Sequence, residues 1–101
     1  YQVVSSQVFS EMSDTMNPQG IIAVAYEPKE APLFAFLESR EPVIFFLDRI
    51  QDPGNLGSII RSADAFGIHA LILNRGTVDP YNTKVIRATM GSLFRTSLIF
   101  S

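Results

Sequence analysis

The feature that most constrains the fold is a short apolar segment that runs into a polar turn and then into an amphipathic helix. Phe45, Phe46 and Leu47 form an unbroken apolar run, which is typical of a strand buried on both faces of a parallel sheet. Asp52-Pro53-Gly54-Asn55 cannot continue a strand, so the chain is expected to turn near Pro53. Beyond the turn, apolar residues at helical spacing predict a helix from ~55 to ~66: Leu56, Ile59, Ile60, Ala63 and Phe66.

The rest of the chain alternates between predicted strands and predicted helices. We expect strands at residues 21–25, 43–47, 69–73 and 96–100. Further helices are expected at ~3–16, after Pro32, and at ~80–90, the last with Asp79 as N-cap and Pro80 at the first helical position. This order predicts an α/β class with a Rossmann-like parallel sheet and helices on both faces, in which residues 43–47 are an interior strand.

Aromatic residues are expected to fill the core rather than to stack on bases. Seven phenylalanines fall at core-like spacing: Phe34, Phe36, Phe45, Phe46, Phe66, Phe94 and Phe100.

Composition limits the possible classes of protein. The 101 residues, 47% hydrophobic and 18% charged, suffice for one folded domain. No apolar run is long enough to span a bilayer, so no membrane partner is expected. With no cysteine and one histidine, thiolate and histidine-cluster metal sites are excluded, as is a cysteine nucleophile.

Charge is distributed unevenly along the chain. Residues 1–48 carry two basic against seven acidic side chains, a net charge of −5, whereas residues 49–101 carry six against three, a net charge of +3. The half that contains the strand–turn–helix segment is therefore the basic half, as a surface facing nucleic acid would require.

Candidate chemistry gathers at the turn and the start of the following helix. Helical side chains lean toward the N-terminus, so the Arg61 guanidinium should reach back toward the turn that holds Asn55 and Gly57. The unpaired N–H groups of a helix start add to this positive charge, and the site would suit an anion such as a phosphate. Asn55 also has a structural interpretation as a turn or N-cap residue, and Arg61 one as a solvated helix charge.

Other polar residues have open or structural interpretations. Asp48 and Asp52 resemble an acid pair, but Asp52 before Pro53 is an ordinary turn former and no metal partner is visible, so no metal is expected. His69 is interpreted as a surface or strand-edge residue. The cations after residue 80 either line an RNA path or solvate an exposed helix face: Lys84, Arg87 and Arg95.

Two motifs in register resemble those of the SpoU-type ribose 2′-O-methyltransferases of the SPOUT superfamily. The first is similar to D-x-x-x-D-P-x-N-x-G-x-x-x-R-x-A-x-x-F-G, and its matching residues are Asp48, Asp52, Pro53, Asn55, Gly57, Arg61, Ala63, Phe66 and Gly67. Residues 84–93 resemble the family's R-A-S-x-G-A segment, with Thr89 and Ser92 where Ser and Ala are commoner. Two ordered motifs are far more specific than one short pattern.

The resemblance implies a catalytic part that transfers a methyl group from S-adenosylmethionine to a ribose 2′-OH of rRNA or tRNA. Arg61 and Asn55 take the place of catalytic residues, and Arg61 would help to activate the 2′-OH. The implied RNA-binding residues are Asn55, Gly57, Arg61 and Arg87. A homodimer located in the cytoplasm is also implied.

The resemblance further indicates that the knot segment is missing. The later family segments that hold the cofactor, a G-N-E-x-x-G loop and an S-L-N helix start, do not occur, so the cofactor-binding residues are unknown. We expect residues 1–17 to be the end of an upstream recognition domain or a linker helix. Residues 18–101 are then the N-terminal part of an α/β trefoil-knot methyltransferase domain within a longer protein.

Two alternative functions remain to be weighed. A catalytically silent RNA-binding relative would use the same pocket to hold a phosphate or a ribose. An ordinary nucleotide-binding Rossmann enzyme is disfavoured, because neither G-x-G-x-x-G nor G-x-x-x-x-G-K-[ST] follows any predicted strand.

Overall fold

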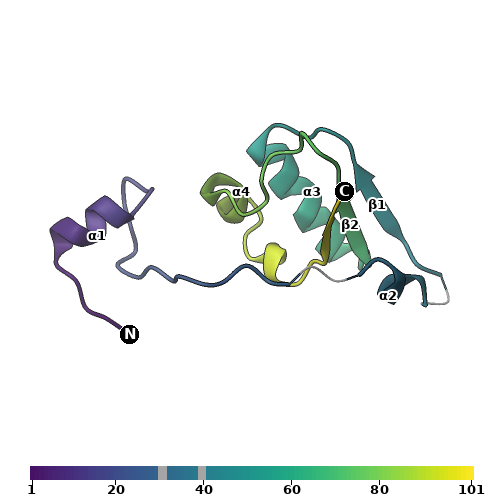
Figure 1. Cartoon of the computed structure of the whole chain (residues 1–101). Coiled ribbons are helices and arrows are strands. Elements are labelled where there is room, and N and C mark those ends of the chain that lie inside the picture. Colours follow the sequence, from purple (N-terminus) through teal and green to yellow (C-terminus); the bar gives the residue numbers. More distant parts are fainter. Residues whose placement is uncertain (30–31, 39–40) are drawn as a thin grey trace.

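A three-stranded parallel sheet organises the chain in the computed structural model, which describes residues 1–29, 32–38 and 41–101. The strands are β1 (Ile44–Leu47), β2 (Ala70–Leu73) and β3 (Leu98–Phe100), and they lie in the order β1-β2-β3. Phe46 of β1 pairs with Ile72 of β2, which in turn pairs with Ile99 of β3. The predicted α/β class and parallel pairing are confirmed (Figure 1).

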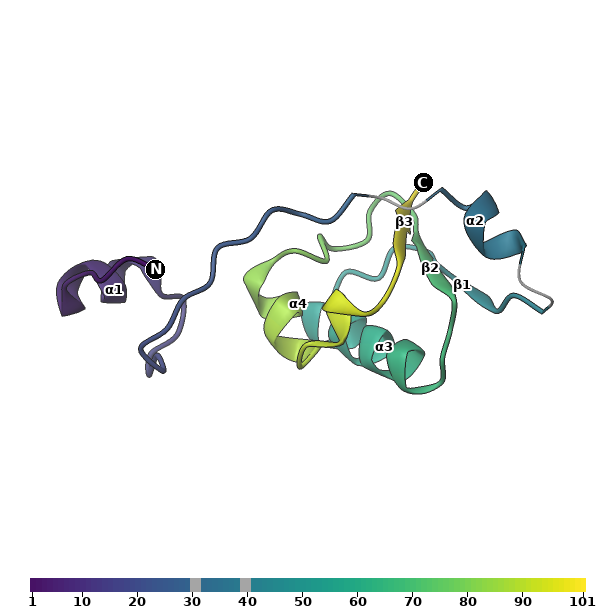
Figure 2. The ribbon, with the colours of Figure 1, turned by 90° about the horizontal axis from the view of Figure 1, so that it is seen from below.

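Two helical connections join the strands. Helix α3 (Pro53–Ala65) links β1 to β2, and helix α4 (Thr83–Ala88) with the short 3₁₀ helix η1 (Ser92–Phe94) links β2 to β3. Crossovers between parallel strands are almost always right-handed, so strands that follow one another in chain order receive their helices on the same face. Figure 2 shows α3 and α4 on one side of the sheet and the four-residue helix α2 (Phe34–Leu37) toward the other side.

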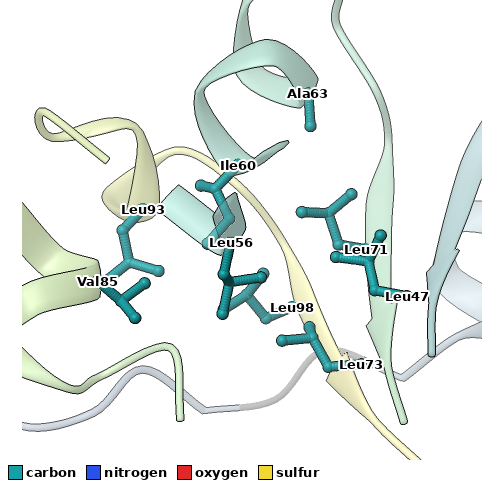
Figure 3. Close-up of a cluster of buried hydrophobic side chains, with 9 residues drawn as sticks. All are labelled: Leu47, Leu56, Ile60, Ala63, Leu71, Leu73, Val85, Leu93 and Leu98. Atoms are coloured by element: carbon teal, nitrogen blue, oxygen red, sulfur yellow. The ribbon is translucent and has the colours of Figure 1, made fainter. Parts of the chain in front are cut away.

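The core between the sheet and these helices is aliphatic. Figure 3 shows side chains from α3, from all three strands and from the α4–η1 connection pointing toward one another. The members of this cluster are Leu47, Leu56, Ile60, Ala63, Leu71, Leu73, Val85, Leu93 and Leu98.

The prediction that phenylalanines fill the core is wrong. Phe66 is 81% exposed and Phe94 is 75% exposed, and Phe36 is only half-buried. The helical stripe that predicts a buried Phe66 fails because α3 ends at Ala65, so Phe66 is the C-cap and leaves the helical face. The others are also exposed: Phe34, Phe45, Phe46 and Phe100.

The prediction of an interior strand at residues 43–47 is also wrong. In the described sheet β1 lies at an edge, and Phe45 and Phe46 are 40% and 59% exposed. The central strand is β2, where Ala70 and Leu71 are fully buried. Periodicity identifies an apolar strand but carries no information on which neighbours it receives, because strand order is set by tertiary pairing.

The first 29 residues form an extended arm that differs from the prediction. Helix α1 (Ser6–Met12) is shorter than the predicted helix at ~3–16, and the hydroxyl of its N-cap Ser5 accepts a hydrogen bond from the N–H of Val8 at 3.3 Å. The predicted strand at residues 21–25 is wrong, because no described strand pairs with this segment and an unpaired strand is not stable in water. Figure 1 shows α1 well away from the sheet.

Helix α4 is shorter than predicted, and its N-cap is a different residue. The side chain of Asn82 accepts from the N–H of Lys84 at 2.9 Å and caps the helix, so the assignment of Asp79 as N-cap is wrong. Asp79 instead accepts from the N–H of Tyr81 at 2.9 Å and closes a turn around Pro80. Within the described ranges, no helix is both long and apolar enough to cross a membrane.

Candidate active site

The start of α3 is fixed by Asp52. Its backbone is extended (φ −80°, ψ 124°), and its side-chain Oδ1 accepts from the N–H of Asn55 at 2.7 Å, which satisfies one of the unpaired N–H groups of the first turn. Pro53 occupies the first helical position, where its fixed φ suits the helix. Asn55 therefore lies in the first turn, as predicted. Because Asp52 is the N-cap, the exposed Asn55 side chain is not needed for capping.

Gly57 brings α3 and α4 into close contact. It is buried, and a Cβ atom built at this position would lie 2.9 Å from the carbonyl carbon and 3.1 Å from the Cα of Ala88. Real Cβ atoms do not approach backbone this closely, so only glycine permits the observed packing. The structure thus gives Gly57 a packing function that sets the separation of the two helices.

Arg61 and Arg87 are carried by the two helices that meet at this contact. Arg61 follows Gly57 by four residues and so lies one turn further along the same side of α3, while Arg87 precedes Ala88 on α4. Both side chains are exposed. Arg87 Nη1 donates to the carbonyl oxygen of Asp14 at 3.5 Å, and the Arg61 guanidinium makes no hydrogen bond or ion pair within the part of the chain that the structure describes.

Asn55 and Arg61 do not lie on the same side of α3. The two residues are six positions apart, or about one and two-thirds helical turns, so they project from different sides of α3. Among the described residues no hydrogen bond joins them. The structure therefore places Gly57 in the α3–α4 contact, leaves Arg61 and Arg87 exposed on these two helices, and leaves Asn55 at the helix start.

Hydrogen bonds join the loop before α3 to the loop after β2. The Asn74 side-chain Nδ2 donates to Asp48 Oδ1 at 2.8 Å, the N–H of Asn74 donates to the Leu47 carbonyl at 2.9 Å, and the N–H of Val78 donates to the Ile50 carbonyl at 2.8 Å. Asp48 and Asp52 thus have separate hydrogen-bond partners. Sequence reasoning did not identify Asn74, although a polar residue directly after a second parallel strand is a usable signal.

Two of the remaining polar residues have structural partners. The Arg95 guanidinium donates from Nε to Asp64 Oδ2 at 3.1 Å and from Nη2 to the same oxygen at 2.5 Å. These hydrogen bonds, with a smaller contribution from Ser92, lower the pKa of the Asp64 carboxyl. The exposed His69 accepts at Nδ1 from the N–H of Val43 at 3.1 Å, which agrees with its interpretation as a surface residue.

A pocket of about 470 Å³ opens at the carboxyl ends of β2 and β3. Ligands of open parallel sheets bind at this edge. The lining combines apolar and polar side chains: Leu73, Asn74, Arg75, Thr77, Val78, Asp79, Pro80, Phe100 and Ser101. Asn74 thus contributes both to the pocket and, through Asp48, to the loop that leads into α3.

Comparison with known proteins assigns the chain to a family. The profile of the SpoU rRNA Methylase family matches residues 42–101, which hold the whole sheet together with α3 and α4. The chain belongs to the SpoU rRNA methylase family.

Characterised relatives and solved structures agree with this assignment. The chain is 39% identical over 97 residues to the 23S rRNA (guanosine(2553)-2′-O)-methyltransferase RlmP of Bacillus subtilis, and the match covers 96% of the chain and 37% of RlmP. It is 42% identical over 98 residues to the mitochondrial rRNA methyltransferase 3B of Danio rerio, with 93% and 21% covered. The crystal structure of an AdoMet-bound rRNA methyltransferase from Sinorhizobium meliloti superposes with a TM-score of 0.84 at 38% identity, over 95% of this chain and 36% of that one.

Proposed function

We propose that this chain is the RNA-facing part of a ribose 2′-O-methyltransferase that uses S-adenosylmethionine and acts on rRNA or tRNA. The chain spans 37% of the length of the Bacillus subtilis relative, so the activity belongs to a protein that contains these residues within a larger domain. The observation that carries the proposal is the exposed Arg61, without a hydrogen bond or ion pair among the described residues, on the capped helix that follows β1. A guanidinium in this position is available to substrate oxygens.

Each site residue has a role in this proposal. Arg61 would bind the ribose 2′-oxygen and stabilise the negative charge that develops on it as its proton passes to a phosphate oxygen of the RNA. The ordinary pKa of arginine lies far above neutrality, so electrostatic stabilisation is physically easier than proton abstraction by Arg61 alone. Asn55 and Arg87 bind ribose or phosphate oxygens. Gly57 contributes by fixing the distance between the helices that carry the two arginines.

The pocket at the carboxyl ends of β2 and β3 fits part of an adenosyl cofactor. Apolar groups such as Val78 and Phe100 suit a base, and polar groups such as Asn74 and Asp79 suit ribose hydroxyls and an amino group. When bound, S-adenosylmethionine supplies an electrophilic methyl group. In this proposal the described residues form one wall of the cofactor site, and most contacts come from family segments outside these 101 residues.

We also propose the organisation that the family resemblance implies. Residues 1–17 belong to an upstream recognition domain or linker, and residues 18–101 belong to the catalytic domain. Assembly as a homodimer and a cytoplasmic location complete the proposal.

Substitution of Arg61 tests the function. In the full-length protein that carries this sequence, Arg61→Ala should lower the single-turnover rate of methyl transfer to RNA by about 10²–10³-fold, because one preorganised electrostatic contact is lost. Cofactor affinity, measured by calorimetric titration, should stay nearly unchanged. Arg61→Lys should restore little activity, since an ammonium group lacks the planar fork of donors of a guanidinium.

Lys29→Ala is the matched control, because it removes an exposed cation that precedes the family-matched residues 42–101. If Arg61→Ala transfers methyl groups to RNA at a near wild-type rate, Arg61 has no role in the reaction and is a solvated charge on the helix. A wild-type protein that binds RNA but transfers no methyl group would support the alternative of a catalytically silent relative.

A further inference from the structure

Two arginines at the carboxyl edge of the sheet have no role in the function proposed above, although Arg75 is among the residues that line the pocket. Arg49 follows β1 and Arg75 follows β2, and both are exposed. Arg49 has a left-handed backbone conformation, with φ +53°, which residues other than glycine adopt rarely. Backbone strain of this kind concentrates at functional sites, so it calls for a functional explanation.

The strained backbone directs the Arg49 side chain onto the neighbouring loop. A Cβ atom built on Gly76 would lie 3.1 Å from Arg49 Cγ and 3.7 Å from its Cδ, so the stem of Arg49 packs over a residue without a side chain. Gly76 itself has φ +90°. Because Arg75 directly precedes Gly76, both arginines project from the same short section of the sheet edge.

The loops that carry the two arginines are held at a fixed separation. Asn74 bonds Asp48 at 2.8 Å, so the residue before Arg49 is joined to the residue before Arg75. Asp48 pairs with Arg49, since its Oδ1 lies 3.4 Å from Arg49 Nε and its Oδ2 accepts from Nη2 at 3.5 Å. Both side chains are exposed, so water screens this ion pair and it contributes little. Asp79, also exposed, accepts from the N–H of Tyr81. For the Arg75 guanidinium, no hydrogen bond or ion pair occurs within residues 1–29, 32–38 and 41–101.

We propose that Arg49 and Arg75 together bind a backbone phosphate of the RNA substrate. This inference rests on the proposed function and extends it by a second contact, at the sheet edge, in addition to the one at Arg61. Guanidinium groups match phosphate geometry through paired N–H donors, and here two of them are carried by loops that a hydrogen bond joins. The site positions the RNA without reading its sequence, since phosphate contacts fix register and base contacts specify.

Salt dependence of RNA binding provides the test, because each phosphate contact releases counterions. In the full-length protein, Arg49→Gln and Arg75→Gln should each weaken binding of a substrate RNA, and each should reduce the slope of log affinity against log salt by about 0.7–0.9. Lys29→Gln removes the same charge from the arm and should leave the slope unchanged. Cofactor affinity should be the same in Arg49→Gln and Lys29→Gln, because neither residue lines the pocket.

The variant Arg49→Gly distinguishes an effect on RNA binding from an effect on protein stability. Glycine adopts a positive φ without strain, so this variant should keep or raise the stability of the protein while RNA binding weakens as in Arg49→Gln. A loss of stability with unchanged RNA affinity would overturn the inference and give Arg49 a structural role.

Two further outcomes would overturn the inference while leaving the proposed function intact. The first is an unchanged salt slope in Arg49→Gln and Arg75→Gln with normal methyl transfer by the wild type. The second is a loss of cofactor affinity in Arg75→Gln with an unchanged slope, which would assign Arg75 to the cofactor pocket that it lines. A wild-type protein that neither binds nor methylates RNA would instead contradict the proposed function itself.

Discussion

The arm of residues 1–29 and the domain of residues 41–101 are both rich in apolar residues, yet only the domain builds a core. In the arm, Val3, Met16 and Val24 are 83%, 99% and 89% exposed, and α1 contains no buried residue. In the domain, Leu56, Ile60 and Leu71 are fully buried. The contrast shows that apolar side chains become buried only where the connections between elements bring two apolar faces into contact.

The order of the elements explains the contrast. In the domain, each crossover returns a helix to the face of the strands that it connects, so the stripe Leu56-Ile60-Ala63 meets β2. The arm has a single short helix and no described strand, and so its apolar side chains have no facing layer. Mutations that act differently in the two regions therefore test this explanation.

The largest difference is expected for truncation of aliphatic side chains. Leu71→Ala should lower the free energy of unfolding by about 2–5 kcal/mol, because it removes buried methyl groups and leaves a cavity. Val24→Ala, in the arm, should change it by less than about 0.5 kcal/mol. Urea unfolding followed by circular dichroism measures both values. Equal costs for the two variants would mean that the arm contributes to the core.

A smaller cost is expected at the contact of the two helices. Gly57→Ala should destabilise the domain by about 1–3 kcal/mol, since α3 and α4 must separate to admit the added methyl group. Ser58→Ala provides the control on the same helix, because Ser58 is exposed and alanine favours helix there. If Gly57→Ala is as stable as wild type, the close approach to Ala88 is not required.

Loss of the N-cap of α3 should lower the free energy of unfolding by less than Gly57→Ala does. Asp52→Ala should lower the free energy of unfolding by about 1 kcal/mol, because the N–H of Asn55 loses its acceptor. Asp52→Ser keeps a capping oxygen and should recover most of the loss. A matching substitution at the N-cap of α1, Ser5→Ala, should leave the unfolding of the domain unaffected, as α1 lies in the arm.

The smallest effect concerns acid pH. The pKa of Asp64 is lowered in the folded protein by its hydrogen bonds to Arg95. Its stabilising contribution is therefore present above the unfolded pKa of ~3.9 and is lost as the pH falls through the lower folded value. Arg95→Gln should flatten the dependence of stability on pH below ~4. Unfolding curves recorded across this pH range measure how stability depends on pH. An unchanged dependence in Arg95→Gln would contradict the stated contribution of Asp64.

Local patterns predicted α3 and the position of Asn55 in its first turn correctly. The stripe from Leu56 to Ala63 and the turn at Pro53 both depend on neighbours within a few residues. The family motifs lie in this same local segment, and Asn55 was placed correctly within one turn of the helix start.

Features that depend on distant parts of the chain were missed or wrong. Whether β1 is central or at an edge depends on where β3 pairs, and the exposure of Phe94 depends on how η1 packs against α3. The bond between Asp48 and Asn74 joins residues 26 positions apart, and no periodicity encodes it. The composition of residues 21–25 is strand-like, but none of the described strands pairs with them.

Because the core is aliphatic, few aromatic side chains can report on the folded protein through ultraviolet absorption or emission. The sequence contains no tryptophan and three tyrosines, of which Tyr1 and Tyr26 are fully exposed in the arm. Tyr81 packs against the core, with its ring centroid 6.4 Å from that of Phe100 at an interplanar angle of 44°. Changes in tyrosine ultraviolet absorption or emission on denaturation or ligand binding therefore originate mainly from Tyr81. This residue gives the carboxyl edge of the sheet an intrinsic chromophore that needs no label.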